Sequence, residues 1–468
     1  MSYIRIRKHY LHLPYILLGA FEFGILFLSF YFLENLQQAF NISPASHVEY
    51  SPALALIYAI ILSCGSLAMG VYLALMREGF LAMFFRTLVA YCFLGALALT
   101  ILAEIWPYFY VGGNNLFWVV MLSTGFTLAS RHFFSKLVNS DQLTRKIVVI
   151  GTGASARQLQ RDYEKDKATL GVKVIGYIGS GQSDVASQYC LEKPTDWLSF
   201  CRENRISEIV VAQEERRKSD GVVFPLEELI RCKLGGIDVI NAVGFYEREF
   251  NQVKLSLLSP SWIIFADGFT VSKTRDFAKR LFDIFISVAL GIVLLPFVLF
   301  AAFLVFIETG RPILYSQVRV GQHGKLFKIY KIRSMRQDAE KGGKAVWASA
   351  NDSRITKVGA FIRNTRLDEI PQIYNVLKGE MSFVGPRPER PEFVAELNES
   401  IPFYSHRHAV KPGLMGWAQL NYPYGASVED ARGKLEYDLY YSKNHSFMMD
   451  FLIMIQTIEV VLLGKGVH

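Results

Sequence analysis

Cysteine is scarce in this sequence and forms no pattern that predicts a bond or a metal site. The 468 residues include only five cysteines, with no Cys-x-x-Cys pair and no cysteine–histidine spacing typical of zinc sites. Their odd number and their spacing therefore support neither a disulfide framework nor a zinc centre. Those in apolar segments are best explained as small buried hydrophobic residues. The cysteines are Cys64, Cys92, Cys190, Cys201 and Cys232.

Internal repeats and low-complexity tracts are absent as well, and a prior of about 150 residues per domain predicts two or three domains. Hydrophobic residues make up 51% of the chain and aromatic residues 14%, and the apolar residues are clustered. The formal net charge of +8 is compatible with nucleic acid, or with anionic headgroups and phosphorylated substrates. The clustering favours a basic membrane protein, so we expect no nucleic-acid partner.

Four apolar stretches occupy the first part of the chain, at 13–33, 52–75, 80–103 and 107–130. Each is close to the roughly 20 residues that a helix needs to cross a bilayer, so we predict a four-helix transmembrane bundle over residues 1–140. Lysine and arginine occur at both ends of this bundle and around the second and third stretches, but not in the other two loops. Both ends should therefore face the cytoplasm. The basic residues counted are Arg5, Arg7, Lys8, Arg77, Arg86, Arg131, Lys136, Arg145 and Lys146.

Glu22 is an ionisable residue inside the first of these stretches. An ionisable group at such a position marks a functional site by default. Alternatively, Glu22 is a carboxyl group that is paired within the bundle or kept protonated, and we favour this second explanation.

Residues 141–262 change to a charged sequence in which strands and helices alternate. A β-branched strand at Ile147–Ile150 precedes a turn with Gly151 and Gly153 and then a helix, as in dinucleotide folds. Two later β-branched runs complete a Rossmann-like module with a parallel sheet. No acidic residue closes the second strand, where a ribose hydroxyl would be held. Nucleotide binding, a structural or regulatory role, and dehydratase or epimerase activity are the alternatives for this module.

A second long apolar run, at 284–307, contains 24 uncharged residues. As a straight helix it would be about 36 Å long, enough to span a bilayer. Basic residues flank both of its ends, however, and Pro296 near its middle removes a backbone hydrogen bond. We therefore predict a re-entrant helix that breaks at Pro296 and leaves on the side from which it entered. The alternative is a kinked fifth span, which would place everything after residue 308 outside the cell.

Two adjacent carboxylates, Asp368 and Glu369, follow a run of basic residues in the last third of the chain. Either Thr365 as an N-cap or Pro371 at the first helical position would place both at the start of a helix that Gly379 ends. Helix N-termini favour acidic side chains, so an ordinary helix start explains the pair when it is taken alone. The same dipole would help to keep Asp368 ionised.

The neighbours of this acidic pair suggest chemistry. Lys331 and Arg333 lie two apart on a predicted strand and point to one side. Arg363 and Arg366 precede the pair, and Arg387 follows it between two prolines that limit its backbone freedom. The planar fork of arginine suits phosphate oxygens. Such a set of charges is either a structural ion-pair network or a phosphoryl-transfer site.

Four motifs in the last third together resemble a known family. KIYKIRSM, TRLDEIPQ, MSFVGPRPE and KPGLMGWAQLNYP follow in this order after a proline-broken apolar segment. They are similar to the bacterial sugar transferases of exopolysaccharide synthesis, which are polyprenyl-phosphate phosphoglycosyl transferases of the monotopic class. The resemblance covers about 270–468, and the long form of the family adds a membrane bundle and a β/α module.

This resemblance implies a fold, a reaction and a location. The fold would be a membrane protein of α and α/β elements: the four-helix transmembrane bundle (1–140), the Rossmann-like module (141–262) and a monotopic α+β catalytic domain (263–468) with the re-entrant helix at 284–307. The enzyme would transfer sugar 1-phosphate from a UDP-sugar to undecaprenyl phosphate and release UMP. It would be a multi-pass protein of the bacterial inner membrane with its soluble domains in the cytoplasm. A homodimer and downstream glycosyltransferases are the further expected partners.

The resemblance also assigns roles to residues. Asp368 matches the nucleophile, which would form a covalent phosphosugar intermediate, and with Glu369 it would hold Mg²⁺. Pro296 matches the proline that breaks the membrane helix. An alternative is that the chain is a catalytically inactive membrane scaffold or nucleotide sensor in polysaccharide assembly. The basic positions expected to bind substrate phosphate are Lys331, Arg333, Arg363, Arg387 and Lys411.

Overall fold

The protein is described here from a computed structural model, in which the chain divides into two compact units, Met1–Phe250 and Asn251–His468. The described residues are 3–6, 9–39, 52–69, 71, 79–109, 113–138, 145–166, 172–179, 184–212, 224–258, 262, 266, 269, 272–336, 354–423, 425 and 427–463. The three-part division expected from the sequence stays a prediction.

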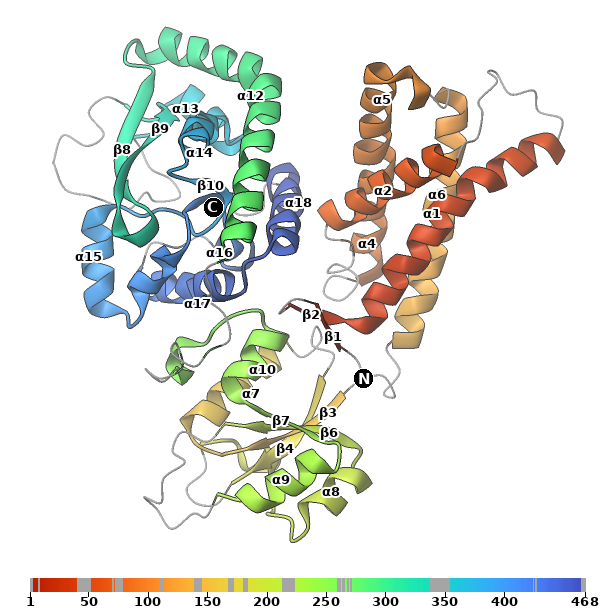
Figure 1. Ribbon diagram of the computed structural model, residues 1–468, viewed down its shortest axis with the longest axis vertical. Coiled ribbons are helices and arrows are strands. Elements are labelled where there is room, and N and C mark those ends of the chain that lie inside the picture. The colour runs from red at the N-terminus through yellow and green to blue at the C-terminus, as the bar shows by residue number, and fades with distance from the viewer. Residues whose placement is uncertain are drawn as a thin grey trace. The chain divides into compact units, whose positions relative to one another are not determined.

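Helices occupy all four apolar stretches of the first unit (Figure 1). The third stretch combines two α-helices with a π-helical segment between them. Within this segment the backbone of Ala90 lies close to Gly65, which belongs to the helix of the second stretch. A short hairpin, β1 (Tyr3–Ile6) with β2 (His9–His12), precedes the first helix. The helices are α1 (Leu13–Ala39), α2 (Pro52–Ala68), α4 (Gly79–Leu88) with η1 (Val89–Gly95) and α5 (Ala96–Ile105), a short 3₁₀ turn η2 (Pro107–Phe109), and α6 (Gly113–Val138).

The four helical segments share one apolar core, which includes Leu26 and Phe30 of α1, Leu62 of α2 and Val119 of α6. Among the described residues of this unit, Met83–Ile105 is long and apolar enough to cross a membrane, while shorter apolar helices are found in α1 and α2. The transmembrane character of the whole bundle therefore stays a prediction.

A buried ion pair joins the first and last helices of this group. Nε and Nη2 of Arg131 each donate to a different carboxylate oxygen of Glu22 at 2.7 Å, and Arg131 also donates to the hydroxyls of Thr87 and Ser66. A buried charge is tolerated when it is paired and hydrogen-bonded. The explanation of Glu22 as a carboxyl group paired within the bundle is confirmed.

Contrary to the prediction from the sequence, Arg131 and Arg86 do not flank the spans but lie buried within helices. Helix α6 continues to Val138, and Arg131 lies within it, fully buried. Arg86 is also buried in α4, where it donates to the carbonyl oxygen of Met69 at 3.1 Å. Neither side chain can therefore report which side of a membrane a loop occupies, and the orientation stays a prediction that rests on the remaining basic residues.

The predicted parallel sheet is confirmed in the rest of the first unit. Five strands, all parallel, run in the order β5-β4-β3-β6-β7, so that β3, which comes first in the chain, lies at the centre of the sheet. Numbered along the module, this order is 3-2-1-4-5, which matches the first five strands of the Rossmann order 3-2-1-4-5-6. The elements are β3 (Arg145–Ile150), α7 (Ala154–Asp166), β4 (Val172–Ile178), η3 (Ser187–Tyr189), β5 (Cys190–Leu191), α8 (Trp197–Glu203), β6 (Ile206–Val211), α9 (Leu226–Leu234), β7 (Asp238–Asn241) and α10 (Ala242–Glu249).

Side chains in this module are held by structural contacts. The carboxylate of Glu208, buried on β6, accepts hydrogen bonds from Arg145 and Arg248. The hydroxyl of Tyr163 donates to the carbonyl oxygen of Val172 and accepts from the backbone N–H of Val174 on β4. These contacts favour a structural role for both groups. Nucleotide binding by the module stays open.

The second unit begins with a segment that the sequence assigns to the preceding module. Residues 251–258, including η4 (Leu255–Leu257), contribute Val253 and Leu255 to the core of this unit. A hairpin of β8 (Leu314–Val320), η5 (Gln322–Gly324) and β9 (Leu326–Ile332) and a parallel pair of short strands, β10 (Ser382–Val384) and β11 (Gly413–Met415), are surrounded by helices. These are α12 (Lys273–Thr309), α13 (Lys357–Asn364), η6 (Leu367–Gln372), α14 (Ile373–Lys378), α15 (Pro391–Ser400), η7 (Tyr404–Ala409), α16 (Trp417–Asn421), α17 (Val428–Asn444) and α18 (Phe447–Leu463).

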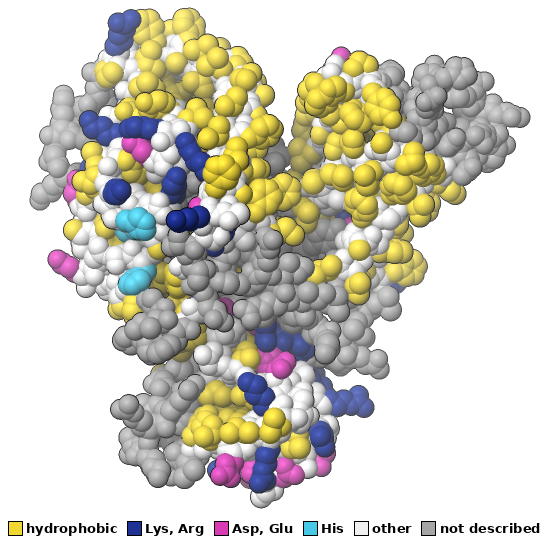
Figure 2. All heavy atoms as spheres, in the orientation of Figure 1, with side chains coloured by type: hydrophobic (Ala, Val, Ile, Leu, Met, Phe, Trp, Pro, Cys, Tyr) yellow, Lys and Arg dark blue, Asp and Glu magenta, His cyan; other side chains and the backbone are white. Residues whose placement is uncertain are grey.

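Helix α12 contains the predicted membrane segment and is long and apolar enough to cross a bilayer. Pro296 does not interrupt the helix as expected, because α12, which is 37 residues long, continues through this proline. Figure 1 instead shows α12 changing direction along its length, as proline-containing helices do when one hydrogen bond is lost. Apolar side chains are exposed along it, including Ile292, Phe300 and Ile307 (Figure 2). Re-entry on one side of the membrane stays a prediction.

Polar contacts attach the first half of α12 to the rest of the unit. Lys279 pairs with Asp450 of α18 at 2.5 Å, and Asp283 accepts hydrogen bonds from the hydroxyl of Ser382 and the backbone N–H of Phe383. The second half packs against β9 and α13 through apolar side chains. One face of this helix is therefore fixed to the rest of the unit, while the other is apolar and exposed.

Candidate active site

The acidic pair lies in a large cavity of the second unit. The cavity has a volume of about 1110 Å³ and is lined by β8, β9, α13, η6, the segment around Arg387 and residues of α16 and α17. Leu290 and Leu294 of α12 also line it, so that one wall is apolar while much of the rest is charged. The site thus combines ionic groups with an apolar wall from α12.

The local backbone around the acidic pair differs from both predicted helix starts. Asp368 and Glu369 lie in the first turn of the 3₁₀ helix η6, which precedes α14. Thr365 is no N-cap, since it ends α13, and Pro371 lies inside η6. The residue before η6, Arg366, adopts a left-handed conformation with φ of 58°, which is uncommon outside glycine.

The end of this helical segment agrees with the prediction. Gly379 follows α14 in the left-handed conformation with φ of 90° and ends the helix. Because η6 and α14 are each only six residues long, a helix dipole explains little about the charges at their start. The properties of the two carboxylates must come from their immediate neighbours.

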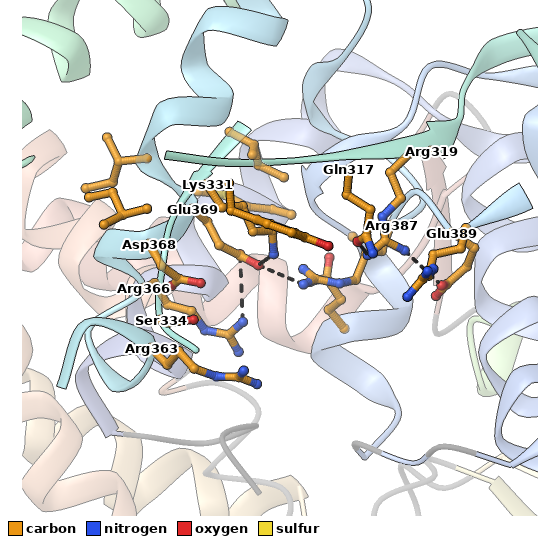
Figure 3. Close-up of a pocket in the computed structure, with 18 of the residues that line it drawn as sticks. Gln317, Arg319, Lys331, Ser334, Arg363, Arg366, Asp368, Glu369, Arg387 and Glu389 are labelled. Carbon is orange, nitrogen blue, oxygen red and sulfur yellow. Dashed lines mark hydrogen bonds and ion pairs between the residues drawn. The ribbon is translucent and has the colours of Figure 1, made fainter. Parts of the chain in front are cut away.

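Glu369 is held by three cations (Figure 3). Its Oε1 accepts hydrogen bonds from Nζ of Lys331 and Nη2 of Arg387, both at 2.7 Å, while Nη1 of Arg366 lies 3.8 Å from its Oε2. Burial alone would raise the pKa of Glu369, but Arg387 and Lys331 outweigh this effect and hold it well below its ordinary range. Glu369 is therefore an ionised acceptor at neutral pH.

Asp368 has a different environment although it is adjacent. It is 7% exposed, and its carboxylate makes no hydrogen bond or ion pair with any residue in the described ranges. Burial and the negative charge of Glu369 raise its pKa, in spite of the opposing effect of Lys331, Arg363 and Arg387. The contribution of a helix dipole to keeping Asp368 ionised stays a prediction, and burial together with Glu369 outweighs whatever favours the ionised form. A buried carboxylate without a partner is a poor structural element and a good candidate for chemistry.

The structure sorts the predicted phosphate-binding cations into two groups. Lys331 and Arg387 contact Glu369, as described above. Arg333 and Arg363 also line the cavity but make no ion pair within the described parts of the chain. Arg333 is 8% exposed and donates from Nη2 to the carbonyl oxygen of Gly310 at 3.3 Å. Its Nε and Nη1 have no hydrogen-bond partner among the described residues. Unpaired buried donors of this kind favour an anion beside them.

Two of the predicted site residues lie away from the acidic pair. Lys411 is absent from the lining of the cavity, and its pKa is lowered by burial and by the neighbouring Arg280 of α12. Pro296 lies in α12 and does not line the cavity either. Neither residue is placed by the structure to contact a group that is bound at Asp368.

A second polar region of the cavity was missed by sequence reasoning. Arg319 of β8 donates to the amide oxygen of Gln317 at 2.7 Å and lies 3.5 Å from the carboxylate of Glu389 (Figure 3). Beyond them, Arg407 pairs with Asp438 at 2.7 Å, and both line the cavity. The two-residue spacing of Gln317 and Arg319 is the same signal that identified Lys331 and Arg333, so it could have been found.

The residues fit a magnesium ion only if the substrate supplies further ligands. The described residues contain no group of three or more His, Cys, Asp and Glu side chains that could hold a metal ion. Asp368 and Glu369 are two hard oxygen donors, and Mg²⁺ typically binds one or two carboxylates together with substrate phosphates and water. The donor set is therefore compatible with Mg²⁺ that enters with a phosphorylated ligand.

Comparisons with known proteins agree with the chemistry of this site. Residues 274–464 match the family described as bacterial sugar transferase. The chain is 40% identical over 369 residues to the UDP-glucose:undecaprenyl-phosphate glucose-1-phosphate transferase of Klebsiella pneumoniae, covering 75% of this chain and 76% of that protein. It is 41% identical over 238 residues to the UDP-N-acetylgalactosamine-undecaprenyl-phosphate N-acetylgalactosaminephosphotransferase of Aeromonas hydrophila, covering 51% of this chain and 55% of that protein. The exopolysaccharide production protein PSS of Rhizobium leguminosarum bv. phaseoli is 42% identical over 194 residues, which are 40% of this chain and 97% of that protein.

Proposed function

The chain belongs to the bacterial sugar transferase family, and we propose that it transfers sugar 1-phosphate from a UDP-sugar to undecaprenyl phosphate, with Asp368 as the nucleophile. The products are UMP and undecaprenyl-diphosphate sugar, the first membrane-bound intermediate of an exopolysaccharide or O-antigen. The observation that carries the proposal is the contrast within the acidic pair. Glu369 is held by cations, whereas the buried carboxylate of Asp368 has no described partner and faces a cationic cavity.

The reaction consists of two displacements at one phosphorus atom. An ionised carboxylate oxygen of Asp368 attacks the β-phosphorus of the donor, a phosphorus–oxygen bond forms, and the bond to the bridging oxygen breaks to release UMP. An oxygen of undecaprenyl phosphate then attacks the same phosphorus, and the bond to Asp368 breaks and regenerates its carboxylate. Dividing one difficult transfer into two steps is the advantage of covalent catalysis.

The surroundings of Asp368 support both steps. Its raised pKa makes the carboxylate a stronger nucleophile once it is ionised, while Lys331, Arg363 and Arg387 favour the ionised form. Arg333 and Arg363, which do not pair with Glu369, supply positive charge for the substrate phosphates. Asp368 and Glu369 would hold Mg²⁺, which when bound offsets the negative charge of the diphosphate. The apolar wall from Leu290 and Leu294 gives a lipid substrate a surface beside the ionic groups.

The same proposal includes the location and partners of the enzyme. We place it in the bacterial inner membrane as a multi-pass protein, with α12 re-entering the bilayer and the catalytic unit in the cytoplasm, where UDP-sugars are made. A homodimer and downstream glycosyltransferases that extend the lipid-linked sugar are further proposed partners. An inactive scaffold or nucleotide sensor is disfavoured, because decay would not preserve a cationic cavity around an aspartate that has no partner among the described residues.

The products distinguish this reaction from ordinary glycosyl transfer. Purified protein with Mg²⁺, undecaprenyl phosphate and a panel of UDP-sugars is expected to release UMP with at least one of them. The Asp368→Asn variant is expected to release none, whereas Asp238→Asn, at an exposed position of β7, should match the wild type. Release of UDP would contradict the mechanism. Unchanged polysaccharide output in cells that carry Asp368→Asn would instead favour the scaffold.

A further inference from the structure

Glu369 cannot bind Mg²⁺ and both of its neighbouring cations at the same time. As proposed above it is a ligand of Mg²⁺, yet its Oε1 already accepts hydrogen bonds from both Lys331 and Arg387 at 2.7 Å. Its other oxygen faces Arg366 at 3.8 Å. A divalent cation brought to this carboxylate would meet three positive charges at close range, and like charges in a partly buried site repel strongly. The free protein is therefore a poor metal site.

We propose that Lys331 and Arg387 change partner during the reaction cycle. They hold Glu369 in the free protein and move to the diphosphate of the UDP-sugar when it enters, which releases Glu369 to bind Mg²⁺. This inference rests on the proposed function and specifies the order in which donor and metal bind. The metal therefore binds Glu369 tightly only once the diphosphate of the donor has taken up the two cations.

The two cations are built for such an exchange. The backbone of Lys331 is fixed in β9 opposite Tyr315, and its flexible four-carbon side chain leaves only the ammonium group to move. The backbone of Arg387 is fixed by its flanking prolines and by Arg407, whose Nη2 donates to the carbonyl oxygen of Arg387 at 2.9 Å. The side chains of Lys331 and Arg387 are 20% and 39% exposed, so both reach the cavity. Only the charged ends must be redirected.

The charges also favour the exchange. Four cations surround the two carboxylates of the acidic pair, which leaves an excess of positive charge around them. They are Lys331, Arg363, Arg366 and Arg387. A diphosphate group offers Lys331 and Arg387 several charged oxygens in place of the single Oε1 that they share. Arginine in particular binds phosphate through two parallel hydrogen bonds. The metal then replaces the positive charge that Glu369 has lost.

The test measures metal binding without turnover. Mn²⁺ serves as the probe, since it takes the same oxygen ligands as Mg²⁺, and unbound Mn²⁺ is quantified by electron paramagnetic resonance. The full chain in detergent is titrated with Mn²⁺ alone and with saturating UDP, which carries the diphosphate but no sugar. Binding of Mn²⁺ to UDP in buffer is subtracted. We expect UDP to tighten Mn²⁺ binding by about 5- to 150-fold, the usual range for coupled ligands.

Two methionine variants test the exchange itself. Lys331→Met removes one of the two cations from Oε1 of Glu369, so Mn²⁺ should bind the protein alone several-fold more tightly, and UDP should add less. Lys328→Met is the matched control, because Lys328 is exposed on the same strand and does not line the cavity. It should behave as the wild type.

Either of two results would overturn the exchange: Mn²⁺ binding that is equally tight with and without UDP, or a free-protein affinity in Lys331→Met no tighter than in Lys328→Met. Failure of the proposed function looks different, because a protein that couples Mn²⁺ and UDP as expected but releases no UMP from any UDP-sugar would keep the exchange and lose the reaction.

Discussion

Removing the charge of Asp368 is expected to stabilise the protein, while the same chemical change at Glu369 is expected to destabilise it. The Asp368→Asn variant replaces a buried carboxylate without a described partner, and burying a neutral amide costs less than burying a charge. Relief of this kind at a functional site is typically worth about 1 kcal/mol. Glu369→Gln instead removes the charged acceptor of two hydrogen bonds from cations, at a cost of about 2 kcal/mol.

The two effects also differ in their dependence on pH. Folding raises the pKa of Asp368 above its ordinary value of 3.8, so the wild type loses stability as the pH rises towards the folded-state pKa. The gain from asparagine is therefore full above that raised pKa and disappears as the pH falls through it. The pKa of Glu369 is lowered below its ordinary 4.5. Its contribution is present above pH 4.5 and is lost only as the pH falls through the lowered pKa.

The assay is thermal unfolding of the full chain in detergent, followed by tryptophan fluorescence between pH 5 and pH 8. For a unit of this size, 1 kcal/mol shifts the melting temperature by about 2–4 °C. We expect Asp368→Asn to melt a few degrees above the wild type at pH 8, and Glu369→Gln to melt several degrees below it. Two shifts of the same sign would refute the contrast on which the assignment of roles rests.

Three further predictions concern other residues. Lys331→Met should reduce UMP release by at least about 10-fold, as expected for a group that stabilises transferring phosphate, whereas Lys411→Met, outside the cavity, should have a much smaller effect; equal losses would place Lys411 in the site. Glu22→Gln should destabilise the first unit by about 3 kcal/mol, because it leaves Arg131 buried without its partner, and unchanged thermal unfolding would contradict this. A cysteine added after residue 468 should resist a membrane-impermeant maleimide in intact cells, since the proposed re-entry of α12 would keep the second unit in the cytoplasm; labelling from outside would refute this topology.

Much of the architecture could be predicted because its signals are local. Apolar runs of about 20 residues predict helices wherever they occur, and all four runs of the first unit are helical. The β-branched strand at Ile147–Ile150 and the glycine turn after it predict a parallel β/α module, which the structure confirms. The constellation in the last third also lies together, since Lys331, Arg333, Arg363, Arg387 and the acidic pair all line one cavity.

What could not be predicted depends on contacts between distant residues. Arg131 follows an apolar run and looks like a flanking charge, and only its pairing with Glu22, 109 positions away, explains its burial. The left-handed conformation before η6 is adopted by Arg366 and not by a glycine, so the sequence does not indicate it and predicts a different start for this helix. The opposite environments of Asp368 and Glu369 depend on which carboxylate the side chains of Lys331 and Arg387 reach, and neighbouring positions in a sequence do not report this.

The covalent intermediate on Asp368 is the central claim, and intact-protein mass spectrometry tests it most directly. The full chain is incubated with Mg²⁺ and an active UDP-sugar, without undecaprenyl phosphate, and then denatured in acid. The wild type should gain the mass of one sugar phosphate, mapped to the peptide that contains Asp368, with one UMP released per chain; undecaprenyl phosphate should remove the added mass. An adduct that persists in Asp368→Asn, or full turnover by that variant, would contradict the account.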